Sequence, residues 1–375
     1  PQGEMLAVHR AFRTDNYGDT VLLQVTLRWV NRLGYRAALS NCTERTAKQV
    51  DGDFEMFLWR EHMRRTVALV YTGGGYLGEG PVTSAKWHRS LVKQVLPIGA
   101  GFRLARKPYG FLGVGVGPLS YRFSRMAIGW LARGARVSSV RDTESRDYLL
   151  AYGGSKERVI VTADLALASE LRDMYPCAGQ GKNLDKPYAL IHLIHKPDTD
   201  AHQWATCECI REFLRTTPNA RVVSVSDNPA KAHREIACSI GEFMGHDCCS
   251  VEAYESPRQL SELISGARFT VTNKLHVGVI SAAYGRPTYA LANHGKTERF
   301  FRQIGRLEHW SPRSTPSLDR LGSFLREAWS GGIGEAPGLG AAREAAEQNR
   351  LFLQRMIAGE LSVSHPESWE NDQCV

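Results

Sequence analysis

Short apolar runs of strand length alternate along the chain with longer segments whose apolar residues recur at helical spacing. In the first half, the runs predict strands at 6–12, 35–40, 67–78, 109–119 and 136–142, and a closing apolar run covers 158–167. The intervening segments predict helices at 20–34, 87–107, 123–135 and 143–154. Three glycines interrupt the run at 67–78.

A stretch rich in Pro, Gly and polar residues, 174–187, is the best linker candidate, and the alternation restarts after it. The second half predicts strands at 188–194, 221–226, 268–273 and 287–292. Helices are predicted at 201–216, 229–243, 257–267, 276–285 and 296–305. Beyond residue 315 the pattern is helical around a Gly-rich loop at 331–340.

Strand–helix alternation in two halves predicts the α/β class, with two doubly wound, Rossmann-like domains that face a cleft. We place the N-terminal domain at 1–175, the C-terminal domain at 186–312 and a helical tail at 313–375. Ligands of such sheets bind beyond the carboxyl ends of the strands. A polar motif that directly follows a strand is therefore a candidate for the cleft.

The composition is that of a packed globular protein, with 43% hydrophobic and 23% charged residues in 375. No apolar run approaches the roughly 18 residues that a membrane span needs, and no signal-peptide pattern opens the chain. Because the chain begins at Pro1, the sequence leaves open a removed N-terminal anchor. We expect a cytoplasmic protein with at most peripheral contact to a membrane surface.

The net charge of +8 favours an acidic partner such as a phosphorylated small molecule, an anionic glycan or a lipid headgroup. A charge that only serves solubility is the alternative. Nucleic acid is disfavoured, since Lys and Arg are spread along the chain and no recognition motif stands out.

The eight cysteines include Cys207-x-Cys209 and the pair Cys248-Cys249. Neither has the C-x2-C or histidine spacing of a zinc site, so we expect reduced thiols and no metal. Reduced thiols suggest a reducing compartment.

Polar and glycine-rich motifs follow the predicted strands of the first half. Asn16, Gly18 and Asp19 follow the first strand, although a turn or helix cap would use the same residue types. Gly73–Gly75 with Tyr76 follow another strand, and three glycines allow close approach of a backbone to a ligand or a tight turn.

Gly113, Gly115 and Gly117 end a further strand, but their G-x-G-x-G-P spacing is not the dinucleotide fingerprint. Close packing is the first interpretation there. Arg141, in Ser139–Asp142, could grip a carboxylate or phosphate in two places, or pair with Asp142 at a helix cap. Asp164 is either a general base or a structural cap.

In the second half, Asn273, Lys274 and His276 stand where a strand ends and a helix begins. A lysine, an imidazole and the free N–H groups of a helix start would converge on one spot, which favours an anion. A histidine there could also transfer a proton near neutral pH. His192 and His195 are weaker candidates.

These motifs occur in one order: N-x-G-D, G-G-G, G-x-G-x-G-P, S-x-R-D, D-x-A, a basic residue two before His276, G-x-P at 285–287, and a helix with Lys296. From about residue 5 to 307 this pattern resembles the polysaccharide pyruvyl transferase family. The family commonly has S-x-R-x-H where this chain has Thr272–His276. Lys274 keeps the charge there but loses the bidentate fork of arginine.

The resemblance implies a fold like that of two-domain glycosyltransferases (GT-B-like) and phosphoenolpyruvate as donor, without another cofactor. The product would be a pyruvate ketal bridging two hydroxyls of a sugar, lipid-linked or not. The implied donor contacts are Arg141, Asn273, Lys274 and Lys296, on the C-terminal side of the cleft. The implied catalytic residues are His276 as acid, or as the group that stabilises departing phosphate, and Asp19 or Asp164 as base. The implied acceptor-side contacts are Asn16, Gly18, Gly73, Gly74, Gly75, Tyr76, Gly115 and Gly117.

Two other functions stay open from the sequence: a glycosyltransferase that uses a nucleotide sugar, and a non-catalytic glycan- or anion-binding relative. The substitution at Lys274 is the one hint toward binding alone. The acceptor sugar is not readable, although the charged segment 41–66 with Trp59, and Trp87–Arg89, are candidate acceptor walls.

Overall fold

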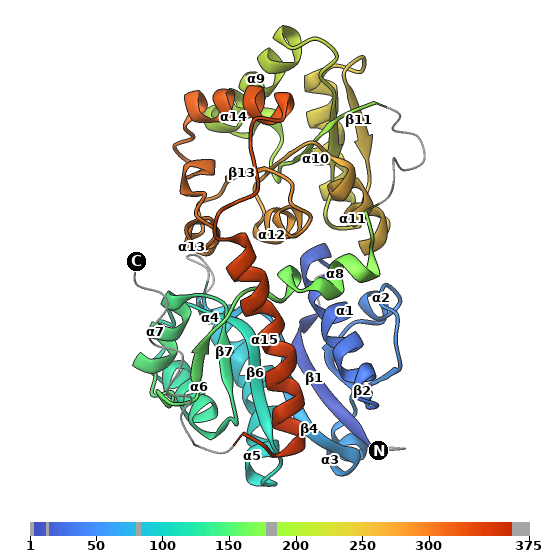
Figure 1. Cartoon of the computed structure of the whole chain (residues 1–375). Helices are drawn as coiled ribbons and strands as arrows, with labels where there is room; N and C mark the ends of the chain where they lie inside the picture. The colour runs from blue at the N-terminus through green and yellow to red at the C-terminus, as the bar shows by residue number, and fades with distance from the viewer. Residues whose placement is uncertain (1–3, 13–14, 80–83, 178–185, 362–375) are drawn as a thin grey trace.

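In the computed structural model, which describes residues 4–12, 15–79, 84–177 and 186–361, the chain forms two parallel α/β units stacked end to end (Figure 1). Within the described residues the N-terminal sheet has eight strands in the order β3-β2-β1-β4-β6-β7-β8, with β5 beside β6. Its strands are β1 (Met5–Phe12), β2 (Arg36–Cys42), β3 (Phe54–Met56), β4 (Thr66–Tyr71), β5 (Gly74–Leu77), β6 (Tyr109–Val116), β7 (Ser138–Val140) and β8 (Val159–Val161).

Amphipathic helices connect these strands, as right-handed crossovers between parallel strands require. They are α1 (Tyr17–Arg32), α2 (Glu44–Ala47), α3 (Trp59–Arg65), α4 (Ser84–Ser90), a π-helical turn (Leu91–Val95), α5 (Leu96–Leu104), α6 (Arg122–Gly134), α7 (Thr143–Ala151) and α8 (Ser169–Met174). The helix predicted at 87–107, with one interruption by proline, does change geometry there: the π-helical turn Leu91–Val95 lies just before Pro97, whose ring cannot sit in a regular helix interior.

The C-terminal sheet has six strands among the described residues, in the order β11-β10-β9-β12-β13-β14. Counted from its own first strand, this is the 3-2-1-4-5-6 order of the doubly wound Rossmann fold. Its elements are β9 (Ala189–His192), α9 (Ala201–Thr216), β10 (Val222–Val225), α10 (Lys231–Met244), β11 (Cys249–Glu252), α11 (Pro257–Gly266), β12 (Thr270–Thr272), α12 (Leu275–Ala283), β13 (Thr288–Leu291), α13 (Gly295–Gln303) and β14 (Trp310–Ser311).

The predicted fold class is therefore confirmed, down to the helical C-terminal part. The sequence pattern missed the short strands β3, β11 and β14, which span three, four and two residues. At that length the apolar alternation has too few positions to stand out, and pairing with a neighbouring strand decides the conformation.

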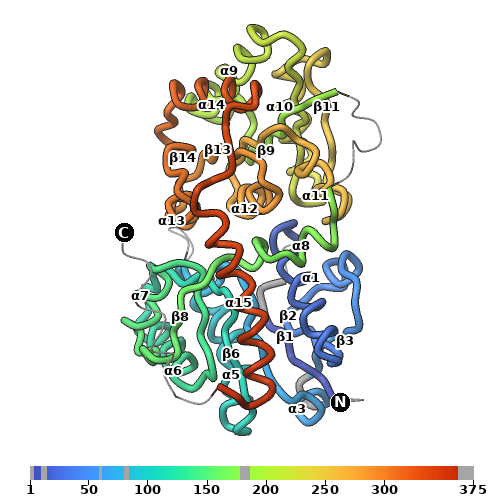
Figure 2. The backbone as a smooth tube through the Cα atoms, in the orientation of Figure 1, coloured from blue at the N-terminus to red at the C-terminus, as the bar shows by residue number. Residues whose placement is uncertain are grey.

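The two C-terminal helices serve different domains. Helix α14 (Leu318–Ser330) packs on α9, whereas α15 (Leu339–Ala358) returns to the N-terminal sheet and lies against β6 (Figure 2). Asn349 of α15 is fully buried, and its Oδ1 lies 2.5 Å from the hydroxyl of Ser139. The return helix thus covers the sheet directly behind Arg141 and Asp164.

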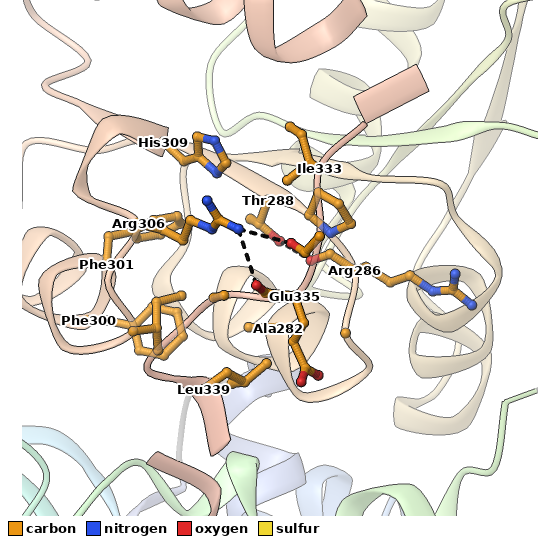
Figure 3. A pocket seen from close by; sticks show the side chains of 15 residues that line it. Ala282, Arg286, Thr288, Phe300, Phe301, Arg306, His309, Ile333, Glu335 and Leu339 are labelled. Carbon is orange, nitrogen blue, oxygen red and sulfur yellow. Dashed lines mark hydrogen bonds between the residues drawn. The ribbon is translucent and has the colours of Figure 1, made fainter. Parts of the chain in front are cut away.

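The segment that links α14 to α15 is held at the base of α12 and α13. There Arg306 donates from Nη2 to the carbonyls of Gly334 and Glu335, both at 3.1 Å (Figure 3). The small pocket beside it, about 30 Å³, is lined by apolar groups such as Phe300, Phe301 and Leu339. It has room for about one water molecule. We assign this pocket to packing of the crossing chain.

The two domains share one buried apolar cluster that runs from α1 to α11 and α12. Tyr17 at the start of α1 donates its backbone N–H to the carbonyl of Asp227, at 3.0 Å. Its hydroxyl lies 2.8 Å from that of Ser261 in α11. The Tyr284 hydroxyl donates to the Tyr175 carbonyl across the same boundary, at 2.7 Å. These bonds fix how the two sheets face each other.

The buried imidazole of His9 in β1 makes the fold sensitive to acid. Burial lowers its pKa from 6.5 to about 3, so the unfolded chain binds a proton that the folded chain does not bind between these values. The free energy of unfolding should therefore fall as the pH drops below about 6.5, by up to about 1.4 kcal/mol per pH unit for this group.

We predict that His9→Gln, which retains a group able to bond to Ser40 Oγ, shows a smaller decrease in stability between pH 6.5 and 4.5. Urea unfolding at both pH values measures this, with exposed His202→Gln as the matched control. Equal slopes for His9→Gln and the wild type would contradict the assignment.

Candidate active site at the domain interface

Charged side chains meet where the strands of both sheets end toward the interface. Arg141 follows β7, Asp164 follows β8, and His276 lies in the first turn of α12 after β12. Arg141 Nη1 lies 3.3 Å from Asp164 Oδ2, and His276 Nε2 lies 3.6 Å from the same oxygen. A carboxylate from one domain thus faces an imidazole from the other.

The Arg141 guanidinium is almost completely buried and is held on several sides. Its Nε lies 3.6 Å from Asp142 Oδ2, and Asp142 also pairs with Arg299 of α13, at 3.2 Å from Nη1 to Oδ1. A Cβ at Gly115 would lie 2.7 Å from Arg141 Nη2, and one at Gly75 would lie 3.2 Å from it. Glycine at these two positions therefore leaves the space that the guanidinium occupies.

Asp164 stays ionised although it is buried. Burial alone would raise its pKa, but the His276 imidazole and the positive charge of Arg141 outweigh this effect. Together with the N–H of Ala166, 3.2 Å from Oδ1, they hold the pKa of Asp164 well below its ordinary value. A carboxylate of such low basicity is better suited to orient a charged imidazole than to accept a proton.

His276 reaches Asp164 because α1 and α12 meet at their N-termini. A Cβ at Gly18 would lie 2.3 Å from His276 Cβ and 2.4 Å from its Nδ1, so the ring packs directly on the glycine. His276 Nε2 is buried and has no hydrogen-bond partner among the residues that the structure describes, since 3.6 Å exceeds hydrogen-bond length. An unsatisfied buried nitrogen is where a ligand atom would gain most.

Lys296, from the first turn of α13, lies next to this cluster. Its Cδ would be 3.9 Å from a Cβ at Gly75. Arg141, Asp142, Asp164 and Lys296 also line a hollow of about 10 Å³. In this conformation it has room for about one water molecule. A larger ligand would have to occupy the space in front of the cluster or separate the domains slightly.

A second charged centre surrounds Asp227, which follows β10; in the sheet, β9 lies between β10 and β12. His192 Nε2 and His233 Nδ1 each lie 3.3 Å from Asp227 Oδ1, and Lys274 Nζ lies 3.2 Å from Oδ2. Asp227 is buried, which alone would raise its pKa. The charges and hydrogen bonds of His192, His233 and Lys274 instead lower the pKa of this carboxyl well below its ordinary value.

The sequence predicted that Lys274 and His276 contact the same anion, but in the structure they belong to two different charged clusters. His276 belongs to the Asp164 cluster, whereas Lys274, the N-cap of α12, is held by Asp227. Asn273 Oδ1 accepts from the Ile194 N–H at 3.0 Å, and its Nδ2 donates to the Leu291 carbonyl at 2.7 Å. In this conformation the Asn273 side chain joins β9 to β13 rather than facing the cleft.

The remaining candidates surround the cluster from the N-terminal side. Asn16 caps α1 by accepting from the Gly18 N–H at 3.1 Å, and Asp19 lies in the first turn of that helix. Gly73 packs on Leu165, and Gly74 has a φ of 124°, which a side chain would strain. Tyr76 is buried, and Gly117 packs against Gly78. Gly75 and Gly115, described above, are the glycines of this set whose added Cβ would meet Arg141.

Sequence reasoning missed Asp227, His233 and Arg299. Asp227 follows the predicted strand at 221–226, so the rule that ligands lie after strands could have found it. His233 and Arg299 lie within helices and carry no such signal. Of the candidate acceptor walls, His88 stacks on Tyr121, with ring centroids 4.3 Å apart. The side chain of Trp59 lies outside the described residues.

No group of three or more His, Cys, Asp or Glu side chains in the described part of the chain is arranged to hold a metal ion. Cys207 and Cys249 are buried, and burial raises the pKa of each thiol to about 12. These two thiols therefore behave as packing groups.

Two parallel-sheet domains with a charged cluster between them define a protein of the GT-B-like class. A family model described as polysaccharide pyruvyl transferase matches residues 16–295, which include Arg141, Asp164 and His276. The chain therefore belongs to the polysaccharide pyruvyl transferase family, as its motifs predicted. The family is one of enzymes that act on saccharide acceptors. No curated protein matches the sequence.

Solved structures confirm the fold. A complex of S. aureus MnaA with UDP aligns with a TM-score of 0.64 at 11% identity, covering 98% of this chain and 99% of that one. A UDP-GlcNAc 2-epimerase from Neisseria meningitidis aligns with a TM-score of 0.59 at 10% identity over 94% and 100% of the two chains. Anabaena Alr3699/HepE, solved with UDP and glucose, gives 0.56 at 13% identity over 96% and 100%.

The contact between Gly18 and His276 predicts a sharp steric requirement. Gly18→Ala should destabilise the fold by about 1–3 kcal/mol, since the methyl group must displace the imidazole. Chemical unfolding measures this effect. Gly340→Ala is the control, because a Cβ at Gly340 meets nothing within 4 Å. Equal stability of the two variants would show that the two helix ends separate without cost.

The Asp227 centre predicts a pH-dependent loss. Asp227→Asn leaves Lys274, His192 and His233 without their carboxylate, and removing one partner of a buried ion pair costs about 3–5 kcal/mol. Because folding lowers the pKa of Asp227, its contribution is complete above the ordinary value of 3.8 and disappears as the pH falls below it. Unfolding of wild type and variant should differ most near pH 7 and converge in acid. A constant difference down to pH 2 would contradict this.

Proposed function

We propose that this protein transfers the enolpyruvyl group of phosphoenolpyruvate onto two hydroxyls of one sugar and releases phosphate, forming a pyruvate ketal. The observation that carries the proposal is the contact of His276 with Asp164, beside Arg141 and Lys296, at the meeting point of both domains. The family supports pyruvyl transfer in general. The donor and the ketal are our extension.

Binding and activating phosphoenolpyruvate requires cations that neutralise its charges and an acid that protonates its enol carbon. Phosphoenolpyruvate carries a carboxylate and a phosphate, which Arg141 and Lys296 can neutralise. Arg141 offers the planar fork that matches a carboxylate. Lys296 offers a point charge that suits a phosphate, and Lys274 would join it only by leaving Asp227. The cations of the chain itself do this work, so we propose a mechanism without metal or further cofactor.

The first step is a proton transfer to carbon. His276, whose Nε2 lies 3.6 Å from Asp164, is our candidate for the acid that donates a proton to the CH2 carbon of the enol, which becomes a methyl group. The carbon that bears the phosphate becomes electrophilic, and a sugar hydroxyl oxygen bonds to it. Asp19, in the first turn of α1 beside Gly18, is our candidate for the base that takes the hydroxyl proton.

The second step exchanges phosphate for the other hydroxyl. The carbon–oxygen bond to phosphate breaks, and phosphate leaves with both electrons. The second sugar hydroxyl bonds to the same carbon and closes the ring, and its proton leaves with the phosphate. In the overall balance, two hydroxyl protons are lost, one to the new methyl group and one to phosphate. Asp19 returns its proton to the site as His276 is reprotonated.

Asp164 acts as a positioning residue in this scheme. Its low pKa keeps it negative throughout, so it stabilises the imidazolium without taking the proton. The acceptor enters from the N-terminal side, past the glycine turns at 73–75 and 115–117. A saccharide acceptor follows from the family. Assays with free and with lipid-linked acceptors distinguish the two forms of this saccharide.

Release of inorganic phosphate from phosphoenolpyruvate tests the proposal. The panel should contain galactosides, mannosides and N-acetylhexosamine lipids, with mass spectrometry to detect the ketal. We expect His276→Gln to reduce kcat by about 10²–10⁴-fold, the usual worth of a positioned acid. His202→Gln, on an exposed part of α9, is the control and should retain full activity.

A nucleotide-sugar reaction is the competing function, because several structural neighbours were solved with UDP or UDP-sugars. Release of UDP from UDP-sugars, with none of phosphate from phosphoenolpyruvate, would replace our proposal by this one. Binding of phosphoenolpyruvate without turnover over the whole panel would identify a binding protein. Full activity of His276→Gln would remove the assigned acid.

A further inference from the structure

The acidic residues of this chain are distributed unevenly. Residues 80–141 contain eleven Lys and Arg and no Asp or Glu. The other residues hold 36 of the 47 basic residues and all 39 acidic ones, so they carry a net charge of −3 against the overall +8. The positive charge of the molecule therefore comes from one continuous part of the N-terminal domain.

Large apolar side chains are exposed in the same part. Among the described residues nine large hydrophobic side chains are exposed, and five of them lie between 104 and 130. Three are on α6: Phe123 (54% exposed), Met126 (59%) and Trp130 (37%). Tyr121 precedes α6, and Leu104 ends α5 with 79% of its surface exposed. We call these five residues the apolar ridge.

The ridge is one surface rather than five separate side chains. Phe123, Met126 and Trp130 are three and four residues apart, so they share one side of α6. The guanidinium of Arg103, next to Leu104, lies 4.2 Å over the Trp130 ring and joins the two helices. Figure 1 shows α5 and α6 in the lower part of the N-terminal domain, away from the C-terminal domain.

Arginines border the ridge along the whole of α6. Arg122, Arg125 and Arg133 are exposed and stand on the neighbouring strip of the helix. In the part of the chain that the structure describes, none of these three guanidinium groups pairs with a carboxylate. Arg133 donates from Nε to the Gly153 carbonyl at 3.1 Å, but within the described residues none of the three charges is neutralised. Arginines without a carboxylate partner beside exposed Phe, Met and Trp suit a surface that is negatively charged and also accepts apolar side chains.

We propose that this face of the N-terminal domain docks on the surface of an anionic lipid bilayer. Phe, Trp and Met side chains enter the boundary between headgroups and acyl chains, and Tyr and Trp favour that depth. The arginines pair with lipid phosphates at the same level, each adding about a fivefold gain in binding. The helix lies in the plane of the surface, in keeping with the finding that no helix among the described residues could cross a membrane.

A bilayer fits better than a protein partner does. The cores of protein interfaces are depleted of charge, whereas here arginines alternate with the apolar residues along one helix. A partner protein would need an acidic groove shaped to this strip. A fluid layer of anionic headgroups provides negative charge and apolar depth without a fixed shape.

One end of the apolar ridge lies near the active site. Helix α6 follows β6, whose carboxyl end holds Gly115 beside Arg141, so the Tyr121 end of the ridge lies nearest the cleft. Docking would bring the cleft mouth to the membrane surface, where a lipid-linked saccharide could reach it. This consequence rests on the proposed function, but the docking itself does not.

Vesicle sedimentation of the full chain tests the docking. With phosphatidylcholine vesicles containing 30% phosphatidylglycerol, we expect at least about tenfold stronger binding than with phosphatidylcholine alone, and weakening with added salt. The double variant Arg122→Glu/Arg125→Glu and the variant Phe123→Ser/Met126→Ser should each reduce binding about tenfold or more. The matched control is Lys231→Glu with Trp204→Ser, an exposed charge and an exposed aromatic on the C-terminal domain.

Brominated lipids measure how deeply Trp130 enters the bilayer. Quenching of tryptophan fluorescence on vesicle binding should be largely lost in Trp130→Phe, which keeps an aromatic ring for docking. Thermal unfolding of each variant without vesicles should match the wild type, because the changed side chains are exposed.

Three results would overturn the proposal: equal binding to neutral and anionic vesicles, equal loss in the control variant, or a stable dimer in solution that Phe123→Ser/Met126→Ser dissociates. None of these measurements uses phosphoenolpyruvate. Failure of docking and failure of the proposed reaction are thus distinguishable.

Discussion

The site depends on one close contact, the packing of the His276 ring on Gly18. It brings the start of α12 in one domain against the start of α1 in the other, with no room for a side chain between them. Because His276 is held there, its Nε2 points at Asp164, which the N-terminal domain supplies. Neither domain alone contains both the imidazole and its carboxylate, so the site exists only when the two sheets are docked.

Burying charged side chains at this interface is energetically unfavourable. Several oppositely charged partners around each buried carboxylate, rather than one, offset this cost. Asp164 is surrounded by Arg141 and His276, and Asp227 by two histidines and Lys274. Each carboxylate is kept ionised by several partners, which fixes the position of each cation more firmly than one contact would. Such preorganised charges are most effective in a site that excludes water, because solvent does not have to rearrange as the reaction proceeds.

Helix α15 packs on the N-terminal sheet and supports β7 and β8, the strands that Arg141 and Asp164 follow. Both strands are three residues long, and Asn349 of α15 bonds behind them to Ser139 and Thr162. Arg141 and Asp164 each follow those residues by two positions. The C-terminal part of the chain, which reads from the sequence only as helices, thus supports the strand ends that hold the site.

The sequence by itself determined the fold class and which charged residues follow the strands. The spacing of apolar residues specifies strands and helices locally. Parallel strands put the residues that follow them at the carboxyl edge of the sheet, so the sequence alone indicated Arg141, Asp164 and His276 as candidates. Only the tertiary structure decided which of them meet. Lys274 and His276 are two residues apart, yet one pairs with Asp227 and the other with Asp164. That choice depends on contacts between residues more than a hundred positions apart, such as Gly18 with His276, for which local spacing carries no signal.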